Sequence, residues 1–227
     1  ELFELFDRQR FELYGFCWSN EDGSEVRARV IKAMDHFIRI KDLDDVAAAH
    51  CIVSHEIDVL VDLHGLTSGA RPNIVAAKPA PVQMTYLGFP GPTGLPGIDY
   101  VFADQFLIPE HEKPYYSELP LYLPHVYQSS DRKRPVGVIP TREQCGLPSD
   151  KFIFCSFNNN YKFNEEVFDC WLRILRRVPN SLLWLLADNQ WAQQNLIEHA
   201  SKQGIDTARL IFAPRVAPAD YLARYTA

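Results

Sequence analysis

A polar segment with one lysine carries the chemistry best suited to an anion: Phe157-Asn158-Asn159-Asn160-Tyr161-Lys162. It lies between a predicted strand, 151–157, and a predicted amphipathic helix, 164–178. Ligands of parallel sheets bind beyond the carboxyl ends of the strands, where the next helix adds free backbone N–H groups and a partial positive charge. We therefore expect Lys162 to neutralise a diphosphate and the asparagines to hydrogen-bond to it. The residues alone also allow an asparagine-rich turn with an exposed lysine.

The segment Asp62–Arg71 follows a near-continuous apolar run, 57–63, which predicts a strand buried on both faces. The same edge of the sheet would then carry His64 as a base or hydrogen-bond donor. Gly65 and Gly69 would let the backbone approach a ligand. A loop with a hydrogen-bonded histidine is the alternative interpretation.

A third candidate is the loop 87–97. Residues 88–98 contain four glycines and three prolines, so neither a helix nor a central strand is expected there. A backbone this rigid, with so few side chains, suits close packing against a flat or sugar-like ligand. A structural crossover between domains is the alternative.

Several common chemistries lack their motifs in this sequence. Both nucleotide-binding glycine patterns, G-x-x-x-x-G-K-S/T and G-x-G-x-x-G, are absent, and no G-x-S-x-G elbow supports a hydrolase triad. A metal site built from His55, Asp58, Asp62 and His64 is disfavoured by the spacing of these residues. The tryptophans Trp171, Trp184 and Trp191 have the spacing of core residues.

The elements that must position these loops alternate between strand and helix, which predicts an α/β fold with parallel sheets. The predicted strands are 11–18, 36–40, 57–63, 82–87, 100–103, 151–157, 181–187 and 209–213. The predicted helices are 24–34, 44–56, 164–178 and 191–203, and the start of another is predicted at 219–227. The prolines of the stretch 124–150 indicate a domain boundary. We therefore expect one lobe at 1–130, a linker at 131–150 and a second lobe from 151 to 227.

The composition is that of a soluble globular protein, with 227 residues, 47% hydrophobic and 23% charged. No apolar run approaches the roughly 20 residues of a membrane span. A net charge of −6 disfavours general nucleic-acid binding, and the basic cluster 132–134 is interpreted as a solvated linker. The five cysteines include no C-x-x-C pair, and Cys155 and Cys170 are expected to be buried thiols. These features favour the cytoplasm.

The three candidate loops, taken together with further motifs, favour the functional interpretation of each loop over its structural alternative. The motifs are Asp62–Arg71, Lys78–Gln83, Tyr86–Gly91, Asp99-Tyr100, Asp104, Tyr116–Glu118, Leu123–His125, Gly146–Pro148, Phe157–Lys162, Val178–Ser181 and Leu183–Leu186. In order and spacing they resemble the catalytic region of the O-linked N-acetylglucosaminyltransferases, a family that includes SPINDLY-type enzymes and bacterial homologues. The resemblance covers essentially the whole chain.

The resemblance implies a GT-B-type glycosyltransferase with two Rossmann-like domains, the second one incomplete in this chain. It implies transfer of N-acetylglucosamine from UDP-N-acetylglucosamine to serine or threonine hydroxyls of proteins, with inversion and without a metal or other cofactor. Protein substrates would be bound through upstream tetratricopeptide repeats. The donor could instead be GDP-fucose or UDP-glucose, and a non-catalytic scaffold is a further alternative.

The resemblance also assigns roles to individual residues. It places Lys162 on the donor diphosphate and Leu87, Gly88 and Phe89 against the sugar and acceptor, alongside His64 and Gly65. Asn159 stands where a glutamine of the family contacts the donor. Val216, Ala217, Tyr221 and Arg224 match the region that holds the uridine. Other family motifs, including the proposed catalytic base, match nothing in residues 1–227, so this stretch alone is expected to be inactive.

Overall fold

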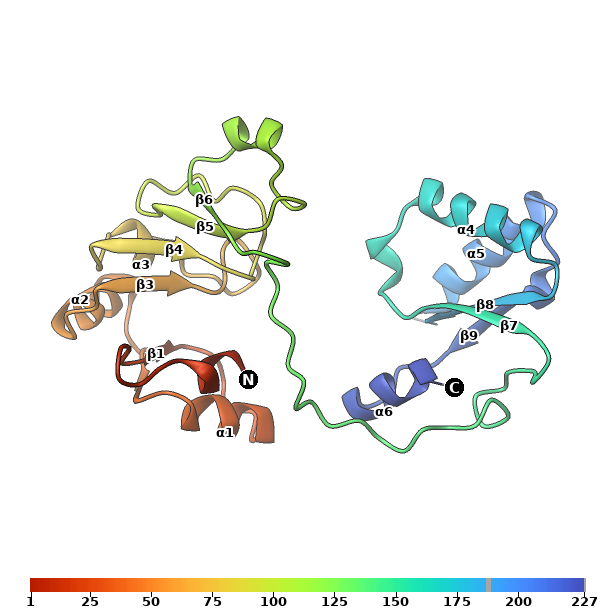
Figure 1. Cartoon of the computed structure of the whole chain (residues 1–227), viewed down its shortest axis with the longest axis horizontal. Helices are drawn as coiled ribbons and strands as arrows, with labels where there is room; N and C mark the ends of the chain where they lie inside the picture. Colours follow the sequence, from red (N-terminus) through yellow and green to blue (C-terminus); the bar gives the residue numbers. More distant parts are fainter. Residues whose placement is uncertain (187–188, 227) are drawn as a thin grey trace. The chain divides into compact units, whose positions relative to one another are not determined.

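The computed structural model describes residues 1–186 and 189–226. The chain forms two compact units, Glu1–Arg132 and Lys133–Ala227. Each unit is built from parallel strands connected by helices (Figure 1). Within the described residues, no helix is long and apolar enough to cross a membrane.

The first unit begins with a 3-10 helix, Leu2–Leu5, and a parallel pair of strands, β1 (Tyr14–Cys17) and β2 (His36–Arg39). Two helices follow these strands, α1 (Glu25–Lys32) and α2 (Asp45–Ser54). Each helix begins where a side chain accepts a hydrogen bond from the first turn: Ser24 from the N–H of Arg27, and Asp44 from that of Ala47.

A second sheet in this unit has the order β3-β4-β5-β6, all parallel. Its strands are β3 (Val59–Asp62), β4 (Val82–Thr85), β5 (Tyr100–Ala103) and β6 (Leu119–Tyr122), with α3 at Pro72–Ala76 and a 3-10 helix at Glu110–Tyr115. Neither β6 nor α3 was predicted. The expectation of a strand buried on both faces at 57–63 was wrong. β3 is an edge strand, and Val59, Val61 and Leu63 are exposed.

The second unit has a sheet of order β7-β8-β9. Its strands are β7 (Phe152–Ser156), β8 (Ser181–Leu186) and β9 (Leu210–Ala213), and its helices are α4 (Glu165–Arg177), α5 (Gln190–Lys202) and α6 (Pro218–Ala223). Short 3-10 helices occupy Asn160–Lys162, Thr207–Arg209 and Arg224–Thr226. The central strand, β8, is buried along its whole length, because α4 and α5 cover one face of the sheet and α6 the other (Figure 1).

The segment 133–150, most of the predicted linker, packs onto the second unit. Gly137 donates its N–H to the carbonyl of Ala219 at 2.9 Å. The side chain of Leu147 is buried against Trp184 and Leu186. The unit therefore begins before its first strand. Residues 187 and 227, at the ends of a predicted strand and a predicted helix, lie outside the described residues.

Three predictions of burial were wrong in this unit. Cys155 is exposed because β7 is an edge strand of the described sheet, and Cys170 is exposed because it lies on the outer face of α4. Trp191 is 68% exposed in the first turn of α5, whereas Trp184 is buried in the core as predicted. Helical periodicity marks the apolar positions of a helix, but it does not show whether its first turn is covered by the rest of the fold.

Candidate functional site

The carboxyl edge of the β7-β8-β9 sheet gathers the predicted donor-binding residues of the second unit. The guanidinium of Arg215, after β9, donates to the amide oxygen of Asn159, after β7, at 2.6 Å. The amide of Asn160 reaches the carbonyl of Leu186, the last residue of β8, at 3.5 Å. The loop after β7 is thus bonded both to the last residue of β8 and to the loop after β9, at the edge where ligands of parallel sheets bind.

Lys162 is the last residue of the short 3-10 helix in this loop, and its side chain is exposed. Its ammonium makes no hydrogen bond or ion pair with any residue that the structure describes. The sequence predicted help from the start of α4, but the side chain of Asn164 already accepts from the N–H of Val167 there, and Glu165 and Glu166 occupy the first turn. The positive charge for an anion at this point therefore comes from Lys162 and not from the helix end.

Arg224 is only 7% exposed, although the resemblance places it at the uridine. Its guanidinium donates to the carbonyl of Pro214 at 3.0 Å and lies over the rings of Phe157 and Trp184, 5.0 and 5.8 Å from their centroids. Such cation–π contacts stabilise a buried guanidinium. Arg224 therefore holds α6 and the adjoining 3-10 helix against the sheet.

Tyr221 lies beside Arg224 and meets the ring of Phe157 edge-on. Its hydroxyl is 2.7 Å from that of Tyr225. Burial, followed by this hydrogen bond, raises the pKa of Tyr225 above its usual value. Val216 is partly exposed, and Ala217 is the N-cap residue of α6, without a capping side-chain hydrogen bond.

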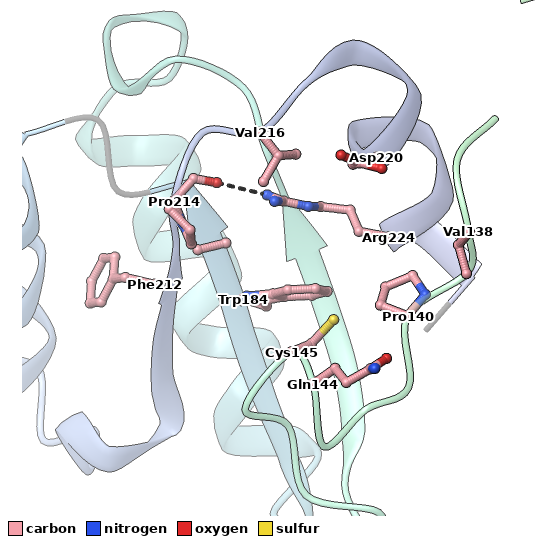
Figure 2. Close-up of a pocket in the computed structure, with 11 residues that line it drawn as sticks. Val138, Pro140, Gln144, Cys145, Trp184, Phe212, Pro214, Val216, Asp220 and Arg224 are labelled. Atoms are coloured by element: carbon pink, nitrogen blue, oxygen red, sulfur yellow. Dashed lines mark hydrogen bonds between the residues drawn. The ribbon is translucent and has the colours of Figure 1, made fainter. Parts of the chain in front are cut away.

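A pocket of about 340 Å³ lies beside α6 (Figure 2). Its lining combines the predicted uridine residues Val216 and Arg224 with Trp184, Asp220 and four residues that precede β7: Val138, Pro140, Gln144 and Cys145. The indole N–H of Trp184 is buried and has no hydrogen-bond partner among the described residues.

In the first unit, the predicted residues lie in the loop after β3. The carboxylate of Asp62 accepts the backbone N–H groups of His64 at 3.0 Å and Gly65 at 2.8 Å, which fixes the turn. The imidazole of His64 lies 4.9 Å from the indole ring of Trp18. Its Nδ1 is buried and unpartnered within the described part of the chain. The backbone of His64 is therefore held in place, while the Nδ1 atom of its side chain remains able to form a hydrogen bond.

The loop that contains Leu87, Gly88 and Phe89 packs directly on this turn. Gly88 lies so close to the carbonyl of His64 that a Cβ atom would be 2.3 Å from its oxygen. A Cβ added to Gly65 would lie 3.3 Å from that of Phe89. Leu87 has a φ of 68°, a strained value for a leucine, and its side chain is partly exposed. The structure thus brings together all five residues that were predicted in this unit.

Sequence reasoning gave no role to Glu118, which holds the rest of this glycine- and proline-rich loop. Its buried carboxylate accepts the backbone N–H of Thr93 at 2.8 Å, the hydroxyl of Thr93, and that of Ser117 at 3.0 Å. The hydroxyl of Tyr116 donates to the carbonyl of Pro90 at 3.0 Å. Nothing in the spacing indicates the contacts with Thr93 and Pro90, because they join segments about 25 residues apart.

One group of metal-ligating side chains occurs among the described residues: Glu165, Asp169 and His199, on α4 and α5. His199 is 2.6 Å from the carboxylate of Asp169 and 3.8 Å from that of Glu165. These pairs explain the cluster as a contact between two helices. The spacing that was weighed for a metal at 55–64 gives no such group within residues 1–186 and 189–226.

Comparison with known proteins decides the family. The profile of glycosyl transferase family 41 matches residues 2–137 and 130–225, nearly all of the chain. The chain belongs to this family. It is 36% identical, over 98% of its length, to an Arabidopsis thaliana protein named probable UDP-N-acetylglucosamine–peptide N-acetylglucosaminyltransferase SEC. It is 35% identical, over 69% of its length, to the SPINDLY protein of the same plant, which carries the same enzyme name.

The fold of this family 41 chain also matches a solved structure. A lysine-to-methionine mutant of the O-GlcNAc transferase of Thermobaculum terrenum superposes with a TM-score of 0.84 over 98% of the chain, at 25% identity. This match confirms the predicted α/β fold of GT-B type. The chain spans 42% of that structure and 23% of the SEC protein.

Proposed function

We propose that the protein to which this chain belongs transfers N-acetylglucosamine from UDP-N-acetylglucosamine to serine or threonine hydroxyls of other proteins. The observation that carries the proposal is Lys162, an exposed ammonium without a described partner at the carboxyl edge of the β7-β8-β9 sheet. The names of the SEC and SPINDLY relatives support the donor and the kind of acceptor.

In the proposed reaction, an acceptor hydroxyl oxygen forms a bond to the anomeric carbon while the bond from that carbon to the β-phosphate oxygen breaks. The nucleoside diphosphate leaves with the electron pair, and the hydroxyl proton passes to a general base. A single displacement of this kind inverts the anomeric configuration. Lys162 would stabilise the charge that develops on the leaving phosphate, the role that a metal ion has in other enzymes. We therefore propose that no metal or other cofactor is required.

We propose that the residues predicted in the first unit contact the sugar and the acceptor. His64 and the backbone of Leu87-Gly88-Phe89 form a rigid surface, because Gly88 packs on the carbonyl of His64. Protein acceptors would be recruited partly by tetratricopeptide repeats elsewhere in the full-length protein, which we expect to act in the cytoplasm.

The experiment is a transfer assay on the full-length protein with UDP-N-acetylglucosamine, UDP-glucose and GDP-fucose as donors and a serine- and threonine-rich peptide library as acceptor. We expect turnover with UDP-N-acetylglucosamine that persists in EDTA. Lys162→Ala should lower kcat at least about a hundredfold, as loss of a charge-stabilising donor does.

The matched control is Lys202→Ala, which removes an exposed lysine from the last turn of α5 and should leave turnover unchanged. Turnover only with GDP-fucose or only with UDP-glucose would show that this nucleotide-sugar is the donor. Near-wild-type turnover by Lys162→Ala would refute the role of Lys162. Absence of transfer with every donor would favour a non-catalytic scaffold.

A further inference from the structure

Arg215 joins two loops that are far apart in the sequence. It is the second residue after β9, and its guanidinium donates at 2.6 Å to the amide oxygen of Asn159, the third residue after β7. Because β8 lies between these two strands, the bond spans the end of the central strand. Arg215 is exposed to solvent at this edge.

The same bond changes what Asn159 can do. Its amide oxygen accepts from Arg215, and its amide nitrogen donates to the hydroxyl of Tyr161 at 3.1 Å. Both ends of the amide are thus engaged within the protein. The sequence assigned Asn159 a direct contact with the donor, but its geometry is that of a side chain that orients a neighbour.

We propose that Arg215, oriented by Asn159, is a second cationic contact for the diphosphate of the nucleotide-sugar, beside Lys162. The inference rests on the proposed function and adds a binding residue to its donor site. A guanidinium presents five N–H donors in a rigid fork, so it can bind an amide oxygen and phosphate oxygens at the same time.

The local charge supports this assignment. A diphosphate spreads at least two negative charges over two phosphates, whereas Lys162 is a compact point charge at the end of one loop. Glu165 and Glu166 follow that loop in the first turn of α4 and oppose an anion. Within the segments 157–166 and 214–217, Lys162 and Arg215 are the two cationic residues. One stands on either side of β8, a placement suited to the two phosphates.

The test measures affinity for nucleotides in the full-length protein, by calorimetry for UDP and by ligand-observed NMR for uridine. We expect Arg215→Ala to weaken UDP binding about tenfold or more, as loss of a charge-assisted hydrogen bond does, and to leave uridine binding unchanged. Arg215→Lys should recover part of the loss. Asn159→Ala should weaken UDP binding less, and the double variant should bind UDP no more weakly than Arg215→Ala alone.

The matched control is Arg173→Ala, which removes an exposed arginine from α4. Circular dichroism would confirm that each variant is folded. Equal losses for UDP and uridine, or unchanged UDP affinity in Arg215→Ala, would overturn this inference and leave the proposed function standing. A wild-type protein that binds neither UDP nor GDP would overturn both.

Discussion

Gly88 and His64 are in contact through their backbones, and the glycine leaves no room for a side chain. A Cβ atom at position 88 would be 2.3 Å from the carbonyl oxygen of His64 and 2.5 Å from that of Leu63. Real Cβ atoms do not approach backbone oxygens this closely, so two loops of the candidate site share one packed boundary.

The first prediction concerns this boundary. Gly88→Ala should force the loops apart, lower the free energy of unfolding of the first unit by about 1–3 kcal/mol, and accelerate hydrogen exchange in peptides that cover 62–66 and 86–91. Gly94→Ala is the control, since Gly94 has a φ of +64° but nothing within 4 Å of an added Cβ. It should lose stability through its backbone alone, without faster exchange at 62–66. Identical exchange in both variants would contradict the predicted contact.

The second prediction concerns pH. The carboxylate of Asp104 accepts the N–H groups of Leu107 at 2.7 Å, Tyr127 at 2.7 Å and Phe106 at 2.9 Å. These bonds, that of Leu107 foremost, hold the pKa of Asp104 below its usual value. A carboxyl with a lowered folded-state pKa stabilises the fold above its unfolded pKa of about 3.9, and this contribution is lost as the pH falls through the folded pKa.

We therefore expect Asp104→Asn to be less stable than wild type at pH 7 and to lose less further stability between about pH 4 and pH 2. Urea midpoints measured at intervals of pH would check this. Asp42→Asn, at an exposed carboxyl without a described partner, should follow the wild-type curve. A constant difference between Asp104→Asn and wild type across this range would show that the carboxylate does not titrate with folding.

The third prediction concerns two thiols. Burial opposes ionisation of Cys17, but hydrogen bonds from Ser19 and Arg27 outweigh it and lower the pKa of Cys17. Cys155 is exposed as a residue, but partial burial of its thiol raises its pKa. Because the thiolate is the reactive form, alkylation of Cys17 by iodoacetamide should reach half its maximal rate at a lower pH than that of Cys155. Peptide mass spectrometry across a pH series measures both midpoints in one sample.

Arg27→Ala should raise the pH at which alkylation of Cys17 reaches half its maximal rate, and should leave that pH unchanged for Cys155. A midpoint of Cys17 at or above that of Cys155 would contradict the prediction. Comparing midpoints removes the difference in steric access, since access scales the rate equally at every pH.

The helices that were predicted well from the sequence are those whose ends are set by residues close to them in the chain. Ser24, Asp44 and Asn164 cap the three helices that were predicted to begin beside them, and each makes its capping bond within three residues. The strands were predicted from local apolar runs. The predicted carboxyl ends of 57–63, 82–87 and 151–157 differ from the observed ones by one or two residues, but the loops after them do follow strands β3, β4 and β7.

The features that escaped prediction depend on distant neighbours. An apolar run such as 57–63 does not reveal whether its strand is central or at an edge, and β3 is at an edge. The bond between Asn159 and Arg215 joins residues 56 positions apart. The burial of Glu118 likewise depends on a loop about 25 residues upstream. Local periodicity holds no information on such pairs.

The burial of Arg224 constrains which substitutions can report on nucleotide binding. Replacing it with alanine would remove a cation from between Phe157 and Trp184 and leave the carbonyl of Pro214 without its donor. A variant at this position would lose activity through misfolding of α6 whether or not a nucleotide ever touches the guanidinium. Lys162, which is exposed and makes no hydrogen bond or ion pair with a described residue, is therefore a position at which lost activity can be assigned to the ligand.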